Sequence, residues 1–166
     1  MSEAGEPIAL GRFGAPQDEL LAALNSPVVA RLPELGVIAV EGADAVTFLQ
    51  SQLTNDVAAL SEGDFQLNGY CTPKGRLLAT FHQWRVGPTI LLQLPRELLA
   101  PVRKRLAMFV LRSKATLVDV SDAWNTFAMV GKGAAQSLQG AGFEIPAAPW
   151  TSVATAGGRL HRLPGA

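Results

Sequence analysis

Apolar residues recur at helical spacing in two segments of the chain, which we predict to be its main helices. The clearer one spans 96–109, where apolar residues fall on one stripe and Lys104 lies opposite it. That stripe consists of Leu98, Leu99, Val102, Leu106 and Phe109. The other spans 43–53, where Val46, Leu49 and Leu53 share a face. Shorter helices are predicted over 17–24 and from the turn at 131–133 to about residue 138.

Runs rich in β-branched and apolar residues, bounded by turn residues, predict the strands. They are 27–31, 35–41, 65–71, 76–86, 89–94, 114–120 and 126–130, with short strands at 153–155 and 159–163. In the turn 72–75, Pro73 presets φ and Gly75 accepts a positive φ, which favours a hairpin. Helices and strands do not alternate strictly, so we predict an α+β fold with a mostly antiparallel sheet covered by helices on one face. We expect a flexible tail over 1–16 and one domain over 17–166.

The composition is that of a globular domain, since 48% of the 166 residues are apolar and 17% are charged. The formal net charge is zero, whereas nucleic-acid binders carry excess Lys and Arg, so we expect no direct contact with nucleic acid. Cys71 is the only cysteine, which excludes an internal disulfide and a Cys-rich metal site within the chain. The sequence contains no secretory signal and no apolar run of membrane-spanning length, so we expect a cytoplasmic protein without membrane contact and without a bound metal.

Two features are compatible with anion binding. Gly131-Lys132-Gly133 lies between a strand and a helix, where it either cradles a phosphate or forms an ordinary tight turn, and it matches neither a dinucleotide fingerprint nor a P-loop. The chain's charge asymmetry is a basic cluster, which is either a solvated helix face or a site for carboxylates or phosphates. The cluster consists of Arg96, Arg103, Lys104, Arg105, Arg112 and Lys114.

Catalytic side chains are scarce. Candidates for thiolate or imidazole chemistry are Cys71, His82 and His161, of which the first two fall on adjacent predicted strands. A cysteine within a strand is more often a small core residue, so we predict no catalytic residue. A polar run after the 43–53 helix either lines a pocket for a heterocycle or forms a helix C-terminus and a turn. The run consists of Gln50, Gln52, Thr54, Asn55 and Asp56.

Four strings, in order and at similar spacing, resemble the YgfZ branch of the YgfZ/T-protein superfamily. Residues 42–57, GADAVTFLQSQLTNDV, resemble the family's GADA..FLQ and QLTNDV strings. Residues 71–77, CTPKGRL, are similar to its pKGr hairpin turn, and residues 109–115, FVLRSKA, to its kyvlrskv segment. Residues 127–131, FAMVG, match the strand and glycine turn that follow. The resemblance covers about residues 35–138.

This resemblance implies a tetrahydrofolate-binding accessory protein that supports iron–sulfur cluster assembly or repair and iron–sulfur-dependent tRNA-modifying enzymes. The partners that it implies are folate and iron–sulfur proteins or their assembly machinery. Within the matching strings we expect Asn55 and Asp56 to bond the pterin edge, and Lys74 or Arg112 to meet the glutamate carboxylates of the folate.

Two alternatives remain open. The superfamily includes the T-protein of glycine cleavage, a folate-dependent aminomethyltransferase, whose hairpin carries an acidic pair where this chain has Leu78 and Ala79. Neither side chain handles a proton or orients an amine, so we expect no aminomethyl transfer. The other alternative is an interaction domain that binds no ligand. The late KGC..GQE string of YgfZ-type proteins is absent, so we expect a truncated or incompletely observed polypeptide, or a relative of the N-terminal domain.

Overall fold

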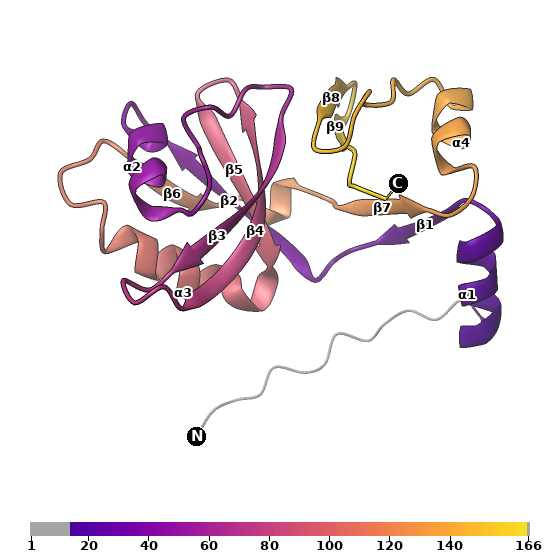
Figure 1. The fold of residues 1–166 in the computed structure, drawn as a ribbon, viewed down its shortest axis with the longest axis horizontal. Coiled ribbons are helices and arrows are strands. Elements are labelled where there is room, and N and C mark those ends of the chain that lie inside the picture. The colour runs from indigo at the N-terminus through magenta and orange to yellow at the C-terminus, as the bar shows by residue number, and fades with distance from the viewer. Residues whose placement is uncertain (1–13, 166) are drawn as a thin grey trace.

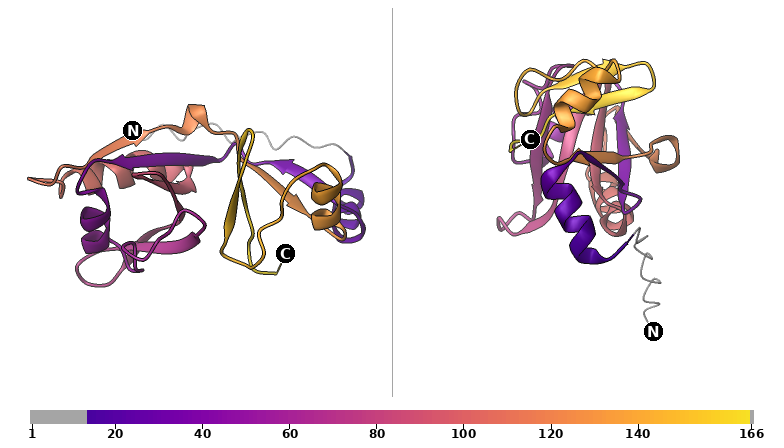
Figure 2. Two further views of the ribbon diagram at one scale, coloured as in Figure 1. Left: turned by 90° about the horizontal axis from the view of Figure 1, so that it is seen from above. Right: turned by 90° about the vertical axis from the view of Figure 1, so that its right-hand side faces the viewer.

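The computed structural model describes residues 14–165 and has an elongated shape (Figure 1). A five-stranded sheet with two helices lies at one end, and a two-stranded ribbon with two further helices lies at the other (Figure 2). Of the predicted tail over 1–16, residues 1–13 lie outside the described residues, and Pro16 is the first residue of α1. The elements are α1 (Pro16–Asn25), β1 (Val28–Arg31), β2 (Leu35–Glu41), α2 (Ala45–Gln52), β3 (Phe65–Cys71), β4 (Leu77–Val86), β5 (Thr89–Pro95), α3 (Arg96–Ala107), β6 (Thr116–Asp119), the 3₁₀ turn η1 (Ser121–Ala123), β7 (Phe127–Val130), α4 (Ala134–Gly140), β8 (Ser152–Thr155) and β9 (Gly158–His161).

The main sheet has the strand order β3-β4-β5-β2-β6, and every neighbouring pair is antiparallel. This confirms the predicted α+β fold with a mostly antiparallel sheet. β2 lies inside the sheet and is buried from Gly36 to Val40, which explains its near-continuous apolar sequence. The β3–β4 turn also has the predicted geometry, with Gly75 at φ 75°.

Helices α2 and α3 cover one face of the sheet, as predicted (Figure 1). Leu99, Val102 and Leu106 of α3 are buried in the main core with Ile38 of β2. The predicted end of this helix was wrong by two residues, because α3 ends at Ala107 and the next N–H groups donate to carbonyls three residues back. Phe109 is therefore not buried with the stripe and is 42% exposed.

The opposite face of the sheet is packed with aromatic rings instead of helices. Phe65 stacks on His161 of β9 with ring centroids 4.1 Å apart, and Trp84 meets the edge of Trp124 at 5.6 Å. Trp150, just before β8, lies 6.1 Å from Phe65. The C-terminal segment, where the periodicity of the sequence is weak, thus supplies the second covering layer.

The ribbon pairs two segments that are distant in sequence, with Val28 opposite Val130 and Arg31 opposite Phe127. The turn from β7 to α4 meets the end of α1 closely, since a β-carbon on Gly131 would lie 2.1 Å from the carbonyl oxygen of Ser26. Gly131 also has φ 100°, so the 131–133 glycines form a tight turn that only glycine fits at its first position.

Candidate functional site

The segment after α2 is fixed to β3 by one buried side chain. Asn68 is 2% exposed, and its Oδ1 accepts hydrogen bonds from the backbone N–H groups of Thr54, Asn55 and Gly69 at 3.1, 2.9 and 2.9 Å. On the other side of the turn, Gln50 Oε1 accepts from the backbone N–H of Val57 at 2.7 Å. The N–H groups of Asn55 and Val57, which have no backbone acceptor within residues 14–165, are thus satisfied by side chains, which holds the segment in one conformation.

Asn55 and Asp56 lie at the exposed tip of this turn. Asn55 Nδ2 donates to the carbonyl oxygen of Leu67 at 3.0 Å, and Asn55 Oδ1 accepts from the N–H of Asp56 at 3.0 Å. Asp56 Oδ1 accepts from the N–H of Ala59 at 3.2 Å, whereas Oδ2 has no partner within residues 14–165. Both side chains therefore support the turn, and the free carboxylate oxygen of Asp56 remains available to a ligand.

Beside Asn55 lies a hollow of about 440 Å³, which we call the Trp150 hollow. Its walls combine an aromatic face from Phe65 and Trp150 with amide groups from Asn55 and Gln66. Asp64 adds a carboxylate, one oxygen of which accepts from the N–H of Ser61 at 2.7 Å. The lining is completed by Ala59, Leu60 and Leu67.

Trp150 is held in the hollow by its backbone. It has φ 63°, a left-handed conformation that costs a non-glycine residue about 1–2 kcal/mol. Its N–H donates to the carbonyl oxygen of Arg162 at 2.8 Å, and its carbonyl accepts from the N–H of Phe65 at 2.9 Å. These two bonds join the C-terminal hairpin to β3. The position of the Trp150 ring is therefore set by the residue after β9 and by the first residue of β3.

An apolar strip continues from the hollow across the aromatic face of the sheet. Leu67 of β3 is 45% exposed, and it lies directly opposite His82 of β4, which in turn lies opposite Gln93 of β5. Leu78, nearer the β3–β4 turn, is also exposed. The strip therefore runs from the Trp150 hollow toward the turn that carries Lys74.

The pKa values of the two histidines beside this strip are both lowered. Burial lowers the pKa of His82. Burial, and secondarily the repulsion from Arg159 and from His82 in its protonated form, lower the pKa of His161 to about 4. Cys71 lies opposite Leu77 at the far end of the β3–β4 pair, whereas His82 lies opposite Leu67, so the pair expected on adjacent strands is not brought together.

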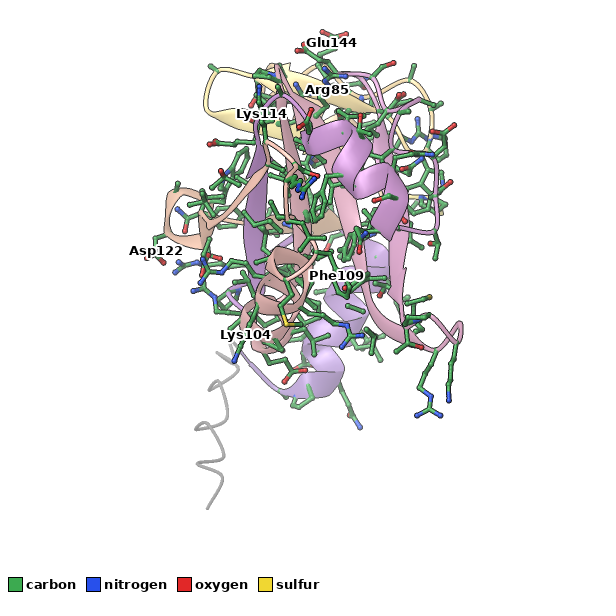
Figure 3. The ribbon with its side chains drawn as sticks, turned by 90° about the vertical axis from the view of Figure 1, so that its left-hand side faces the viewer. Arg85, Lys104, Phe109, Lys114, Asp122 and Glu144 are labelled. Atoms are coloured by element: carbon green, nitrogen blue, oxygen red, sulfur yellow. The ribbon has the colours of Figure 1, made fainter. Side chains whose placement is uncertain are left out.

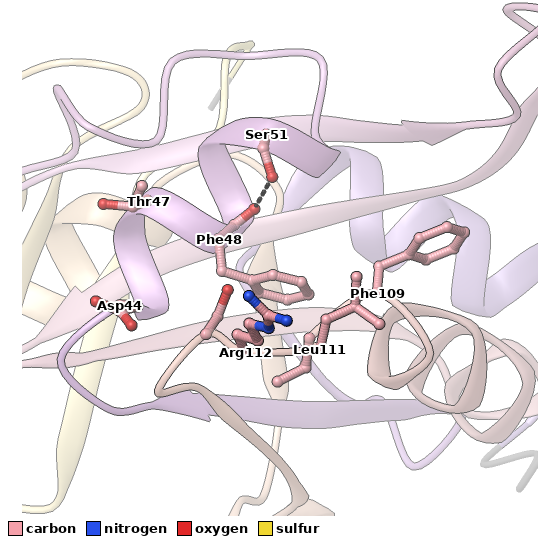
Figure 4. A pocket seen from close by; sticks show the side chains of 9 residues that line it. Asp44, Thr47, Phe48, Ser51, Phe109, Leu111 and Arg112 are labelled. Atoms are coloured by element: carbon pink, nitrogen blue, oxygen red, sulfur yellow. Dashed lines mark hydrogen bonds between the residues drawn. The ribbon is translucent and has the colours of Figure 1, made fainter.

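A second hollow of about 860 Å³, which we call the Arg112 hollow, lies between α2 and the loop after α3 (Figure 4). Its lining includes Phe48 of α2 and Phe109, Leu111 and Arg112 of the loop (Figure 4). It is also lined by Asp44, Thr47, Ser51, Val110 and Ser113.

The four predicted folate ligands do not meet in one place. Asn55 lines the Trp150 hollow and Arg112 lines the other, while Asp56 and Lys74 line neither. Sequence reasoning missed Trp150, because its role depends on a left-handed backbone and on contact with Phe65, 85 residues earlier in the chain.

Within residues 14–165 no three His, Cys, Asp or Glu side chains cluster closely enough to hold a metal ion. No helix in this part of the chain has the length and apolar character needed to cross a bilayer.

Comparison with known proteins identifies relatives that are longer than this chain. No protein-family model matches it. It is 27% identical over 126 residues to the tRNA-modifying protein YgfZ of Colwellia psychrerythraea, covering 76% of this chain and 39% of that protein. It is 32% identical over 106 residues to the mitochondrial iron–sulfur cluster assembly factor IBA57 homolog of Mycosarcoma maydis, covering 56% of this chain and 26% of that protein. The chain thus spans less than two fifths of the length of these relatives.

The fold also has a counterpart among solved structures. The crystal structure of the glycine cleavage system aminomethyltransferase T from Bartonella henselae superposes with a TM-score of 0.72 over 81% of this chain and 37% of that one. The two sequences are 20% identical, so this similarity concerns the fold alone. The chain is thus similar in sequence to YgfZ proteins and IBA57 homologs, in agreement with the resemblance that its sequence motifs carry.

Proposed function

We propose that the chain is the tetrahydrofolate-binding part of a cytoplasmic accessory protein that supports iron–sulfur cluster assembly or repair and iron–sulfur-dependent tRNA modification. The observation that carries this proposal is that the chain resembles both YgfZ proteins, named for tRNA modification, and IBA57 homologs, named for cluster assembly. A function common to both groups is a carrier role next to iron–sulfur proteins, and such proteins or their assembly machinery are the proposed partners.

The Trp150 hollow is the proposed site of the pterin. Its volume of about 440 Å³ falls in the range of small-molecule sites. A flat heterocycle stacks favourably on an aromatic ring such as Trp150, and the pterin edge carries donors and acceptors that match amides and carboxylates. Asn55 lines the hollow, and Asp56, the next residue, has an unpartnered carboxylate oxygen for the same edge.

The strip of Leu67 and Leu78 is the proposed path of the rest of the folate. Both side chains are exposed on one sheet face, where they offer apolar contact to the aminobenzoyl ring. Lys74 is exposed in the turn beyond Leu78, and there it meets the glutamate carboxylates. Arg112 lines the other hollow, so the tail is assigned to Lys74.

This role requires no catalysis by the chain. Leu78 and Ala79 replace the acidic pair that the T-protein resemblance implies, and Ala79 is buried in the main core at 4% exposure. Neither side chain can transfer a proton to a folate-bound carbon. We therefore propose a folate carrier rather than an aminomethyltransferase.

Calorimetric titration with tetrahydrofolate under anaerobic conditions tests the proposal. We expect weak binding by this chain, with Trp150→Ala and Asn55→Ala each lowering affinity about fivefold to a hundredfold, since each removes a stacking surface or a hydrogen-bond partner. Lys104→Ala is the control, because Lys104 is exposed on α3 and lines neither hollow. An absence of folate binding by both this chain and any longer natural form would remove the folate hypothesis.

A further inference from the structure

The Arg112 hollow has features that folate binding does not use. Its floor is apolar, with Phe48 buried at 4% exposure, while its rim carries Phe109 at 42% and Leu111 at 86%. Met108, just outside it, is 57% exposed. Three large apolar side chains within four residues are thus exposed to solvent, a pattern typical of a surface that another molecule covers.

Leu111 lowers the stability of the isolated chain through both its backbone conformation and its exposure. Its φ of 45° is left-handed, which costs a residue with a β-carbon about 1–2 kcal/mol. Its side chain is 86% exposed, so the strain is not offset by burial of apolar surface within this chain. Strained backbone at an exposed apolar residue suggests that the loop is shaped for contact with a partner.

Arg112 adds a positive charge to the lining of this hollow. The guanidinium of Arg112 has no hydrogen-bond or ion-pair partner within residues 14–165. Lys114, two residues further along the chain, is also exposed (Figure 3). The carboxylate in the hollow, on Asp44, accepts a hydrogen bond from the N–H of Lys114 at 2.7 Å and lies at the opposite end from Phe109 (Figure 4). The guanidinium of Arg112 is thus available to an incoming anion.

We infer that the Arg112 hollow is a docking site for an acidic segment of a partner protein that carries bulky apolar side chains. The apolar side chain of the partner fills the space over Phe48, between Phe109 and Leu111, and its carboxylates meet Arg112 and Lys114. Charge complementarity selects an acidic partner, since 96–114 holds six Lys or Arg and one acidic residue, Glu97. A concave site with an apolar floor fits a peptide side chain better than a flat lipid surface. This inference does not depend on the proposed folate function.

Fluorescence anisotropy with labelled peptides tests the inference. The probe is a short peptide in which Leu and Phe recur every three or four positions and Glu fills the others, and the comparison peptide has Lys in place of Glu. We expect the acidic peptide to bind at least about tenfold more tightly than the basic one, and added salt to weaken it. Equal binding of the two peptides would overturn the inference.

Leu111→Gly separates docking from a structural role. Glycine adopts the left-handed conformation freely, so we expect unchanged or higher thermal stability together with about tenfold weaker peptide binding. Arg112→Gln weakens acidic-peptide binding by a similar factor. Leu24→Ala and Lys132→Gln are the matched controls, since Leu24 is 63% exposed on α1 and Lys132 lies in the β7–α4 turn. Undiminished binding by Leu111→Gly would overturn the inference, as would tight binding to vesicles of phosphatidylglycerol and phosphatidylcholine with no binding of either peptide.

Discussion

Asp44 and Lys114, 70 residues apart in the sequence, hold each other by two hydrogen bonds. Asp44 Oδ2 accepts from the N–H of Lys114 at 2.7 Å, and the N–H of Asp44 donates to the Lys114 carbonyl at 3.1 Å. Gly42 permits this approach, because a β-carbon there would lie 2.1 Å from the Lys114 carbonyl oxygen. The GADA string at 42–45 therefore connects the start of α2 to the segment that leads into β6. Through Lys114 it also anchors the end of the loop that lines the Arg112 hollow.

Gly42→Ala should disrupt the hydrogen bonds between Asp44 and Lys114. Gly42 has φ 116°, so alanine adds backbone strain to the collision with Lys114, and we expect a loss of about 2–4 kcal/mol in the free energy of unfolding. Gly75→Ala is the matched control. It also has positive φ, at 75°, but its β-carbon meets open space, so we expect a loss of only about 1 kcal/mol. Urea unfolding measures the free energy of unfolding of both variants. Equal losses would show that the close contact between position 42 and Lys114 does not contribute to the destabilisation.

Acid should destabilise the packing of the C-terminal hairpin through His161. The pKa of His161 is about 4 in the folded chain, against an ordinary value of 6.5. Between these values the unfolded chain binds a proton that the folded chain does not, so stability is complete above pH 6.5 and falls as the pH falls toward 4. From about pH 7.5 to about pH 5 this amounts to roughly 2 kcal/mol.

His161→Phe identifies this contribution. Phenylalanine keeps a ring to stack on Phe65, which His161 contacts at 4.1 Å, and it does not titrate. We expect the variant to lose roughly 2 kcal/mol less than the parent between the two pH values, measured by urea unfolding. The same pH dependence in both proteins would mean that other groups cause it.

Asn68→Ala should loosen the turn that carries Asn55 and Asp56. It removes the acceptor of three backbone N–H groups, and we expect a loss of about 2–4 kcal/mol in the free energy of unfolding. Asn55→Ala is the comparison, because Asn55 is exposed and water can replace its lost bonds, so we expect about 1 kcal/mol or less. Similar losses in urea unfolding for the two variants would contradict the structural role assigned to Asn68.

Much of the fold follows from the sequence because local signals there agree with tertiary packing. The apolar stripe of α3 and the alternating run of β4 predict both the element and its buried face. The hairpin at 72–75 is equally local, since Pro73 and Gly75 define the turn. These parts depend on neighbours within one element, which periodicity reports directly.

The candidate site follows from the sequence only in part, because it depends on contacts between distant segments. The polar run after α2 is visible in the sequence. Asn68, whose side chain accepts hydrogen bonds from this run, lies on β3, and nothing in the sequence around Asn68 indicates that contact. Trp150 reaches the hollow through a left-handed backbone and a bond from Phe65. Arg112 lies in the loop after α3 and lines a different hollow from Asn55, which no local pattern in the sequence indicates.

Variants of Asp56, Lys74 and Arg112 distinguish the two hollows. In the longest natural form, Asp56→Ala should weaken tetrahydrofolate binding about fivefold to a hundredfold, because it removes the unpartnered carboxylate oxygen at the pterin edge. Lys74→Ala should weaken binding of a folate with several glutamates more than that of the monoglutamate, since each added carboxylate strengthens attraction to the lysine. Arg112→Gln should leave both folate affinities unchanged and weaken only the acidic peptide. Calorimetry with the two folates and anisotropy with the peptide measure these effects. A loss of folate affinity in Arg112→Gln as large as in Asp56→Ala would instead support Arg112 as a folate ligand and remove the distinction between the hollows.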